Sequence, residues 1–156
     1  MTYDIPDDAI NEALGMLPEK MDSTMARIMM IAIGLQESRF KYRKQIGGPA
    51  KGWAQFERNG GVRGVMNHHS SKSYAVQVCS KLGVPFNTTS VYNALEHDDV
   101  LAAAFARLLL WTDPHSLPQI DDVDGAWDYY IRNWRPGKPH RHTWDELYQY
   151  AVGHVL

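Results

Sequence analysis

The strongest apolar pattern in the chain runs from Met25 to Leu35, where Arg27 is the only charged residue. The run is too apolar for a helix with one buried face, and it is too short to cross a bilayer. Its apolar side chains recur at the helical step, and Asp22 and Ser23 are candidate N-caps. The pattern therefore predicts a central core helix over residues 23–38.

Helix-type patterning returns in several other segments. The Leu- and Ala-rich stretch from Asp98 or Asp99 to Trp111 has high helix propensity and is followed by Pro114, which predicts another helix. Further helices are predicted over residues 7–17, 70–82, 122–134 and 143–154.

Segment 41–64 has a different composition. It contains six of the 12 glycines, which indicates turns and predicts a short hairpin or an irregular lobe. With no internal repeat or long linker, the 156 residues are expected to form a single domain (1–156), large enough to need no disulfide or metal. The expected class is α+β, mainly α.

The cysteine and aromatic content limits the kinds of site that the chain can form. Cys79 is the only cysteine, which excludes an internal disulfide, and its amphipathic surroundings favour a packed thiol over a nucleophile. Five Trp and eight Tyr are more aromatic residues than a core of this size needs, so some are expected to line a groove.

Charge is unevenly placed around a formal net value of −2. Segments 39–51 and 132–142 are basic, and if the fold brings them together they would meet an anionic polymer; scattered, solvated charge is the alternative. No nucleic-acid-binding module accompanies them, so no nucleic-acid partner is expected.

The N-terminal residues lack a basic stretch followed by an apolar run, and no membrane span is visible. We therefore expect synthesis in the cytoplasm without a signal peptide, no stable membrane insertion, and a monomer.

Glu37 is the most informative residue, because it places one acid near the C-terminal end of the core helix. The helix dipole and burial both disfavour an anion there, so both would raise its pKa toward the range of a general acid. The alternative is an ordinary ion pair with Arg39, Arg43 or Lys44.

Two motifs carry a family resemblance. Glu-Ser-Arg-Phe at 37–40 is followed by Gly-Trp-Ala-Gln at 52–55, with an acid two residues later. This pair resembles the lysozyme superfamily, especially goose-type lysozymes and family 1 lytic transglycosylases, which cleave bacterial cell-wall glycan between N-acetylmuramic acid and N-acetylglucosamine. The resemblance covers about residues 25–57 and implies a lysozyme-like fold with a central catalytic helix and a small Gly-rich hairpin lobe.

The resemblance also implies residue roles. Glu37 would protonate the glycosidic oxygen, Ser38 would help to orient it, and Gln55 would bind the sugar in the groove. Glu57 matches a position where goose-type enzymes often carry an aspartate, so it is the leading second carboxylate. A salt bridge of Glu57 with Lys51 or Arg58 is the alternative.

Aromatic residues are candidates for stacking on sugar faces, with core packing as the alternative for each. Trp53, in the glycine-rich segment, is the leading candidate, and the others are Tyr129, Tyr130 and Trp134. The last three belong to residues 126–137, an expanded version of the small-Tyr-Asn-x-Gly element that lines the groove in the family.

The predicted function is peptidoglycan cleavage at the MurNAc–GlcNAc β-1,4 bond, with bacterial peptidoglycan as partner and no cofactor. Sequence leaves hydrolysis and lytic transglycosylation both open. The small single-domain format is similar to phage-encoded endolysins or virion-associated enzymes, which reach the wall after membrane permeabilisation or virion delivery. A catalytically inactive glycan-binding or virion structural domain is the alternative.

A zinc site is a weaker hypothesis. His68 and His69 are adjacent, and His140 and His142 are followed by Asp145 and Glu146, but there is no His-Glu-x-x-His helix and adjacent histidines are expected to point in different directions. No metal is predicted.

Overall fold

Helices account for all regular secondary structure in residues 2–156, the part of the chain that the computed structural model describes. They are α1 (Asp7–Gly15), η1 (Glu19–Met21), α2 (Thr24–Ser38), η2 (Arg58–Val62), α3 (Arg63–Asn67), α4 (Lys72–Leu82), α5 (Thr88–Leu95), α6 (Asp99–Thr112), α7 (Val123–Trp134) and α8 (Arg141–Val155). The predicted mainly α class is confirmed. Within this range the expected β part is reduced to two isolated antiparallel bridges, Lys44 to Lys51 and Lys51 to Phe56.

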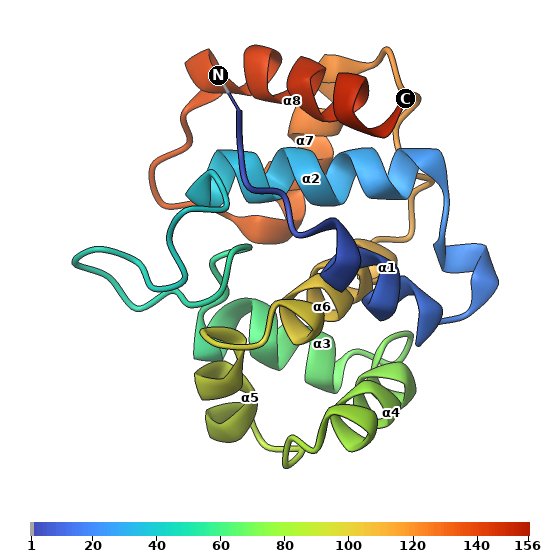
Figure 1. The fold of residues 1–156 in the computed structure, drawn as a ribbon, viewed down its shortest axis with the longest axis vertical. Helices are drawn as coiled ribbons and strands as arrows, with labels where there is room; N and C mark the ends of the chain where they lie inside the picture. The colour runs from blue at the N-terminus through green and yellow to red at the C-terminus, as the bar shows by residue number, and fades with distance from the viewer. Residues whose placement is uncertain (1) are drawn as a thin grey trace.

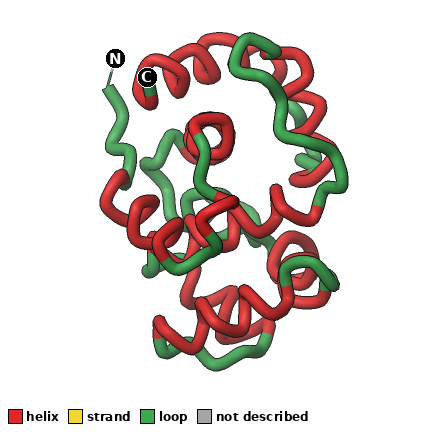
Figure 2. The backbone as a smooth tube through the Cα atoms, turned by 90° about the vertical axis from the view of Figure 1, so that its right-hand side faces the viewer, coloured by secondary structure: helices red, strands yellow, loops and turns green. Residues whose placement is uncertain are grey.

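The central helix predicted over residues 23–38 is α2. Its N-terminus is capped by Ser23, whose Oγ accepts from the Ala26 amide at 3.1 Å. Every residue from Ile28 to Leu35 is buried, which explains why the pattern is apolar all round. In Figure 1 α2 crosses the upper half of the molecule below α8, and in Figure 2 it is seen along its axis, with other helices around it.

The second buried helix is α6, against which α1 and α4 pack. The Asp98 side chain caps it by accepting from the Leu101 amide at 3.0 Å. Arg107 is buried on this helix, and its Nε donates to the Met21 carbonyl at 2.7 Å, which ties η1 to α6. No helix in residues 2–156 is both long and apolar enough to span a membrane.

The lower part of the molecule in Figure 1 contains two helical stretches that the sequence did not predict. Residues 58–67 form η2 and α3, so the glycine-rich segment does not remain irregular to residue 64. Gly61 is required there for packing, because a Cβ would lie 2.2 Å from the Phe56 ring. Helix α5 was also missed; Asn87 caps it by accepting from the Ser90 amide at 2.8 Å.

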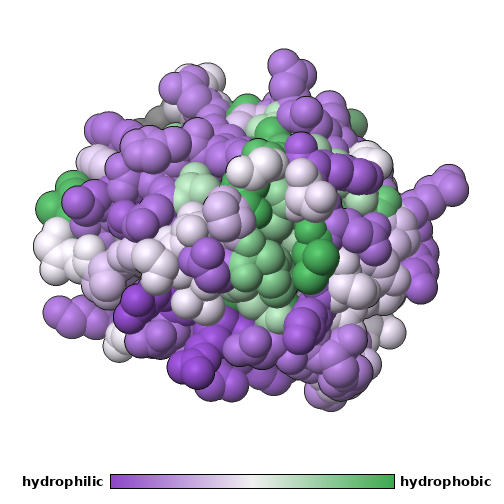
Figure 3. Space-filling view, turned by 90° about the horizontal axis from the view of Figure 1, so that it is seen from below, coloured by the Kyte–Doolittle hydropathy of each residue, from purple (hydrophilic) through white to green (hydrophobic). Residues whose placement is uncertain are grey.

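The lower end of the molecule has an apolar area surrounded by hydrophilic residues, seen from below in Figure 3. Helices α4 and α5 lie at this end (Figure 1). Cys79 of α4 is fully buried, and burial raises the pKa of its thiol to about 11. The prediction of a packed rather than a nucleophilic cysteine is therefore confirmed.

Residues 39–57, called the lobe below, leave the end of α2 and project to one side (Figure 1). The chain reverses at Arg39 and Phe40, both in the left-handed region at φ 57° and 56°. The Phe40 ring then lies over Gly34, where a Cβ would approach to 2.2 Å. This close approach brings the lobe back across the end of the helix that carries Glu37.

Candidate active site

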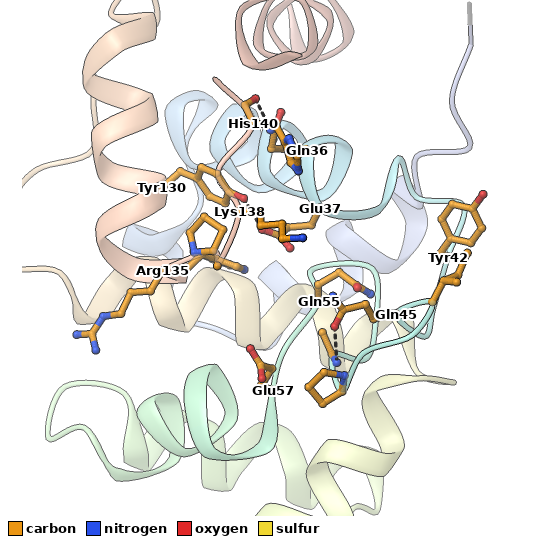
Figure 4. A pocket seen from close by; sticks show the side chains of 16 residues that line it. Gln36, Glu37, Tyr42, Gln45, Gln55, Glu57, Tyr130, Arg135, Lys138 and His140 are labelled. Atoms are coloured by element: carbon orange, nitrogen blue, oxygen red, sulfur yellow. Dashed lines mark hydrogen bonds between the residues drawn. The ribbon is translucent and has the colours of Figure 1, made fainter. Parts of the chain in front are cut away.

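A cavity of about 600 Å³ opens between the end of α2, the lobe and the end of α7 with the segment that follows it (Figure 4). Helix α2 contributes Gln36 and Glu37, the lobe contributes Gln55 and Glu57, and α7 contributes Tyr130. Both of the basic segments noted in the sequence contribute to its lining, but only the second supplies lysine or arginine side chains, those of Arg135 and Lys138. The cavity is therefore built from parts of the chain that are far apart in sequence.

Glu37 is the penultimate residue of α2 and is partly buried at the cavity wall. Burial raises the pKa of its carboxyl from 4.5 to about 7; a hydrogen bond from Tyr130 opposes this rise, and the negative charge of Glu57 adds to it. A carboxyl with this pKa retains a proton in a substantial fraction of molecules at neutral pH. It therefore meets the requirement for a general acid.

Glu37 forms no ion pair within residues 2–156, so the salt-bridge alternative is wrong. Arg43 instead pairs with Asp99, with Nε to Oδ1 at 2.7 Å. The Arg39 guanidinium turns back to the carbonyl oxygens of Leu35 and Gln36. Arg39 and Arg43 are thus engaged elsewhere, and no cation of residues 2–156 pairs with Glu37 to lower its pKa.

Tyr130 lines the cavity, and its hydroxyl donates to Oε2 of Glu37. Its ring is 2% exposed and stacks on Trp144, with ring centroids 5.2 Å apart. Burial, reinforced by the neighbouring Glu37, raises the pKa of the phenol above its ordinary range, so it stays a neutral donor. Stacking of this ring on a sugar, predicted from the sequence, is therefore wrong; the residue holds the acid.

Helix α7 is held in place by a buried carboxylate, Asp113, just after α6. It accepts from Arg132 Nε and Asn133 Nδ2, each at 2.8 Å, and from the backbone and ring of His115. Burial alone would raise the pKa of Asp113, but these hydrogen bonds hold it well below its usual range. This network fixes the helix that presents Tyr130 to Glu37.

Glu57 is exposed and lies across the cavity from Glu37 in Figure 4. It also borders a second cavity of about 490 Å³, to which Pro49 and Tyr92 contribute. The two cavities share Pro49 and Glu57 and therefore adjoin each other at these residues. A water or a sugar hydroxyl can therefore approach from the Glu57 side while Glu37 contacts the opposite side of a bound ring.

The salt-bridge alternative for Glu57 is also wrong within residues 2–156. Lys51 pairs with Glu96, with Nζ to Oε1 at 3.5 Å. Arg58 Nη1 donates to Thr89 Oγ1 at 3.3 Å. The Glu57 carboxylate is left free at the cavity edge.

Ser38 and Gln55 connect the lobe to the site. Ser38 is 3% exposed; its hydroxyl donates to the Trp53 carbonyl at 2.6 Å and accepts from the Phe40 amide at 3.1 Å. Ser38 was predicted to help orient Glu37 at the substrate site, but within residues 2–156 its hydroxyl makes no bond to Glu37 and instead fastens the lobe to α2. Gln55 does line the cavity, in a left-handed conformation (φ 55°), with Nε2 donating to the Gly52 carbonyl at 2.9 Å.

Two predicted sugar-stacking residues are inside the protein. Trp53 is fully buried against Phe40, and its Nε1 donates to the Asp99 carbonyl at 3.3 Å. Tyr129 points away from the cavity, and its hydroxyl donates to the carbonyl of Leu110 at 3.0 Å. Both predictions are wrong for one reason: the lobe and α7 pack on the main core, which covers these rings.

Trp134 lines the cavity and is half-buried, with its Nε1 donating to the Ala54 carbonyl at 2.9 Å. The sequence did not single out Tyr42 and Ile46 as site residues, although both line the cavity and are 41% and 78% exposed. An apolar residue directly before Gly47 and Gly48 was the available signal, because a turn leaves such a side chain without a core to enter.

Metal ligands do not gather anywhere in the described residues: no group of three or more His, Cys, Asp or Glu side chains is suitably placed. His68 and His69 do not diverge as expected, since their rings stack with centroids 4.4 Å apart. His68 Nδ1 instead bonds to the backbone amide and hydroxyl of Ser70.

Comparison of the chain with protein-family models, with curated proteins and with solved structures found no match in any of the three.

Proposed function

We propose that the protein is a glycosidase that cleaves the MurNAc–GlcNAc β-1,4 bond of peptidoglycan, with Glu37 as the general acid. The observation that supports this most is the Glu37 carboxyl itself, at a cavity wall, with a pKa of about 7 and no cation paired with it. Breaking a glycosidic bond requires a proton at the leaving oxygen and stabilisation of positive charge at the anomeric carbon.

In this reaction Glu37 donates its proton to the glycosidic oxygen as the bond to the anomeric carbon breaks. The negative charge of Glu57 then stabilises the developing oxocarbenium ion from the opposite side of the cavity. In hydrolysis, Glu57 takes a proton from a water molecule that adds to the anomeric carbon. In transglycosylation, the 6-hydroxyl of the same muramic acid adds instead, and ionised Glu37 takes its proton to give a 1,6-anhydro product.

Delivery to the substrate belongs to the same proposal. Peptidoglycan lies outside the cytoplasmic membrane, so the protein would meet it after membrane permeabilisation or as part of a virion.

The test measures turbidity loss of purified cell walls with wild type, Glu37→Gln and Glu57→Gln. Glu146→Gln is the matched control, because Glu146 is exposed on α8 and borders neither cavity. We expect Glu37→Gln to lower the rate by roughly 10²- to 10⁴-fold, as loss of a positioned acid does, and Glu146→Gln to match wild type. Equal rates for wild type and Glu37→Gln would refute the proposal.

Mass spectrometry of the released muropeptides then separates the two reactions. Reducing ends, together with strong loss of activity in Glu57→Gln, indicate hydrolysis with Glu57 as base. Anhydro ends, with activity retained in Glu57→Gln, indicate transglycosylation. A wild type that binds walls without releasing any fragment would indicate the inactive glycan-binding alternative.

A further inference from the structure

The segment after α7, residues 135–140 (Arg-Pro-Gly-Lys-Pro-His), forms one wall of the main cavity. Both of its ends are tied to residues next to the proposed catalytic groups. Just before it, Trp134 bonds to Ala54, the neighbour of Gln55. At its far end, the His140 carbonyl accepts from Nε2 of Gln36, the neighbour of Glu37, at 3.0 Å.

The conformation of this segment is further restricted by its own residues. Pro136 and Pro139 have fixed φ angles, and Arg135 begins the segment in the left-handed region at φ 49°. Because of these anchors and restrictions, the side chains of Arg135 and Lys138 emerge from a defined position on the cavity rim.

Arg135 and Lys138 are exposed and have no acidic partner within residues 2–156. The arginines on either side of them are paired: Arg132 with Asp113 at 2.8 Å, and Arg141 with Asp124 and Asp145. Two cations without partners on a constrained cavity wall are therefore available for an anion supplied from outside.

Arg135 and Lys138 are the only lysine or arginine side chains among the described residues that line the cavity. Glu37 and Glu57 line the end of α2 and the lobe, and each would repel a further negative charge. In Figure 4 the Arg135 guanidinium extends outward, away from Glu37. It is therefore placed to meet a group that projects from the sugar chain, not the bond being broken.

We propose that Arg135 and Lys138 bind carboxylates of the peptide stems carried by the glycan, so that the protein selects stem-bearing over bare glycan strands. This inference rests on the proposed function. Glycan without stems offers hydroxyl and acetamido groups and, where an amidase has removed a stem, one lactyl carboxylate held close to the muramic acid ring. A stem carboxylate extends away from the ring and, on reaching the rim, forms charge-assisted hydrogen bonds with Arg135 and Lys138, which the hydroxyl and acetamido groups cannot match.

The test compares wild type with the double variant R135Q/K138Q. The matched control is R63Q/K72Q, which removes two exposed cations that border neither cavity. Three substrates are used: walls freed of teichoic acid, the same walls with stems removed by an amidase, and walls that keep teichoic acid. Cleavage gives kcat and KM, and co-sedimentation with insoluble walls gives binding without cleavage.

On stem-bearing walls without teichoic acid, we expect R135Q/K138Q to raise KM and weaken co-sedimentation by roughly ten-fold with little change in kcat, since two exposed ion pairs are lost. High salt should remove most of this difference. On stem-free glycan the variant should equal wild type, and R63Q/K72Q should equal wild type on every substrate.

Unchanged binding and KM in R135Q/K138Q on stem-bearing walls would overturn the inference. So would an equal loss on stem-free glycan, which would assign the contacts to the sugar chain and its lactyl carboxylates, or a loss seen only with teichoic acid, which would assign them to phosphates. Absence of any cleavage by wild type refutes the proposed function separately, and the stem dependence of co-sedimentation then still decides the binding inference.

Discussion

The Tyr130 hydroxyl on α7 donates a hydrogen bond to Oε2 of Glu37 on α2, across 93 residues of sequence. This bond favours the ionised carboxyl, whereas burial and the charge of Glu57 favour the protonated one. The balance leaves the Glu37 pKa at about 7. Removing a single one of these influences should therefore move the pKa in a known direction.

Tyr130→Phe removes the donor and leaves the ring. We expect the pKa of Glu37 to rise, because its ionised form loses a hydrogen bond while burial remains. The alkaline limb of the pH–rate profile should then move to higher pH. NMR titration of the Glu37 carboxyl measures the same shift in the absence of activity.

Tyr129→Phe is the matched control for that experiment. Its hydroxyl bonds to the carbonyl oxygens of Leu110 and His115, away from Glu37. Each variant should lose about 1 kcal/mol of stability with its hydrogen bond, but only Tyr130→Phe should shift the Glu37 titration. An equal shift in both would contradict the assigned role of Tyr130.

Glu37→Gln should change the dependence of stability on pH. The Glu37 pKa is 4.5 as an ordinary side chain and about 7 in the folded protein, so the folded state holds its proton more tightly. The tighter binding of this proton stabilises the folded state; the stabilisation is fully present below pH 4.5 and is lost as the pH rises through 7. Glu37→Gln cannot ionise and does not lose this stabilisation. Between pH 4 and pH 8 its free energy of unfolding should therefore rise by about 1–3 kcal/mol relative to that of wild type.

Urea unfolding of both proteins across this pH range measures the effect. Glu57→Gln serves as the comparison, because its exposed side chain should change the unfolding free energy by no more than about 0.5 kcal/mol. Parallel pH curves for wild type and Glu37→Gln would show that Glu37 does not carry a raised pKa.

Ser38→Ala should loosen the lobe. The substitution leaves the Trp53 carbonyl and the Phe40 amide without their side-chain partner in a buried place. We expect a loss of about 2–3 kcal/mol, together with faster hydrogen exchange in residues 39–57. Ser73→Ala, at an exposed position on α4, should have neither effect. Full stability with unchanged exchange in Ser38→Ala would contradict this role.

Gly34→Ala tests the close packing at the end of α2. The new methyl would lie 2.2 Å from the Phe40 ring, so the ring and the lobe must move. We expect a destabilisation of about 1–3 kcal/mol, typical of overpacking, and reduced activity. Gly153→Ala, with nothing within 4 Å of the added Cβ in α8, should instead stabilise by about 0.5–1 kcal/mol. Thermal unfolding of the two variants distinguishes them.

The long helices were predicted well because their apolar repeats and caps are local signals. The range 23–38 matches α2, and 122–134 matches α7, to within a residue at each end. Helix α5 was missed because its Thr-Thr-Ser start has low helix propensity, although Asn87 before it is a strong cap. Residues 58–67 were missed because Gly61 there serves tertiary packing and not a turn.

The site was only partly predictable. Glu37 was identifiable because a lone acid ends an apolar helix, and Gln55 and Glu57 followed from the family resemblance. Trp53 was misjudged because sequence does not show that the lobe packs on the main core and covers this ring. The bond from Tyr130 to Glu37 depends on how α7 is oriented by Asp113, which no local pattern encodes.

The burial of Cys79 makes this protein suited to site-specific chemical labelling. A thiol reacts as its thiolate, and a pKa of about 11 leaves almost none at neutral pH. A cysteine introduced in place of Ile46, which is 78% exposed at the cavity edge, would therefore be the only reactive thiol in the chain. A fluorescent dye attached there would report the arrival of a substrate without any background from the native cysteine.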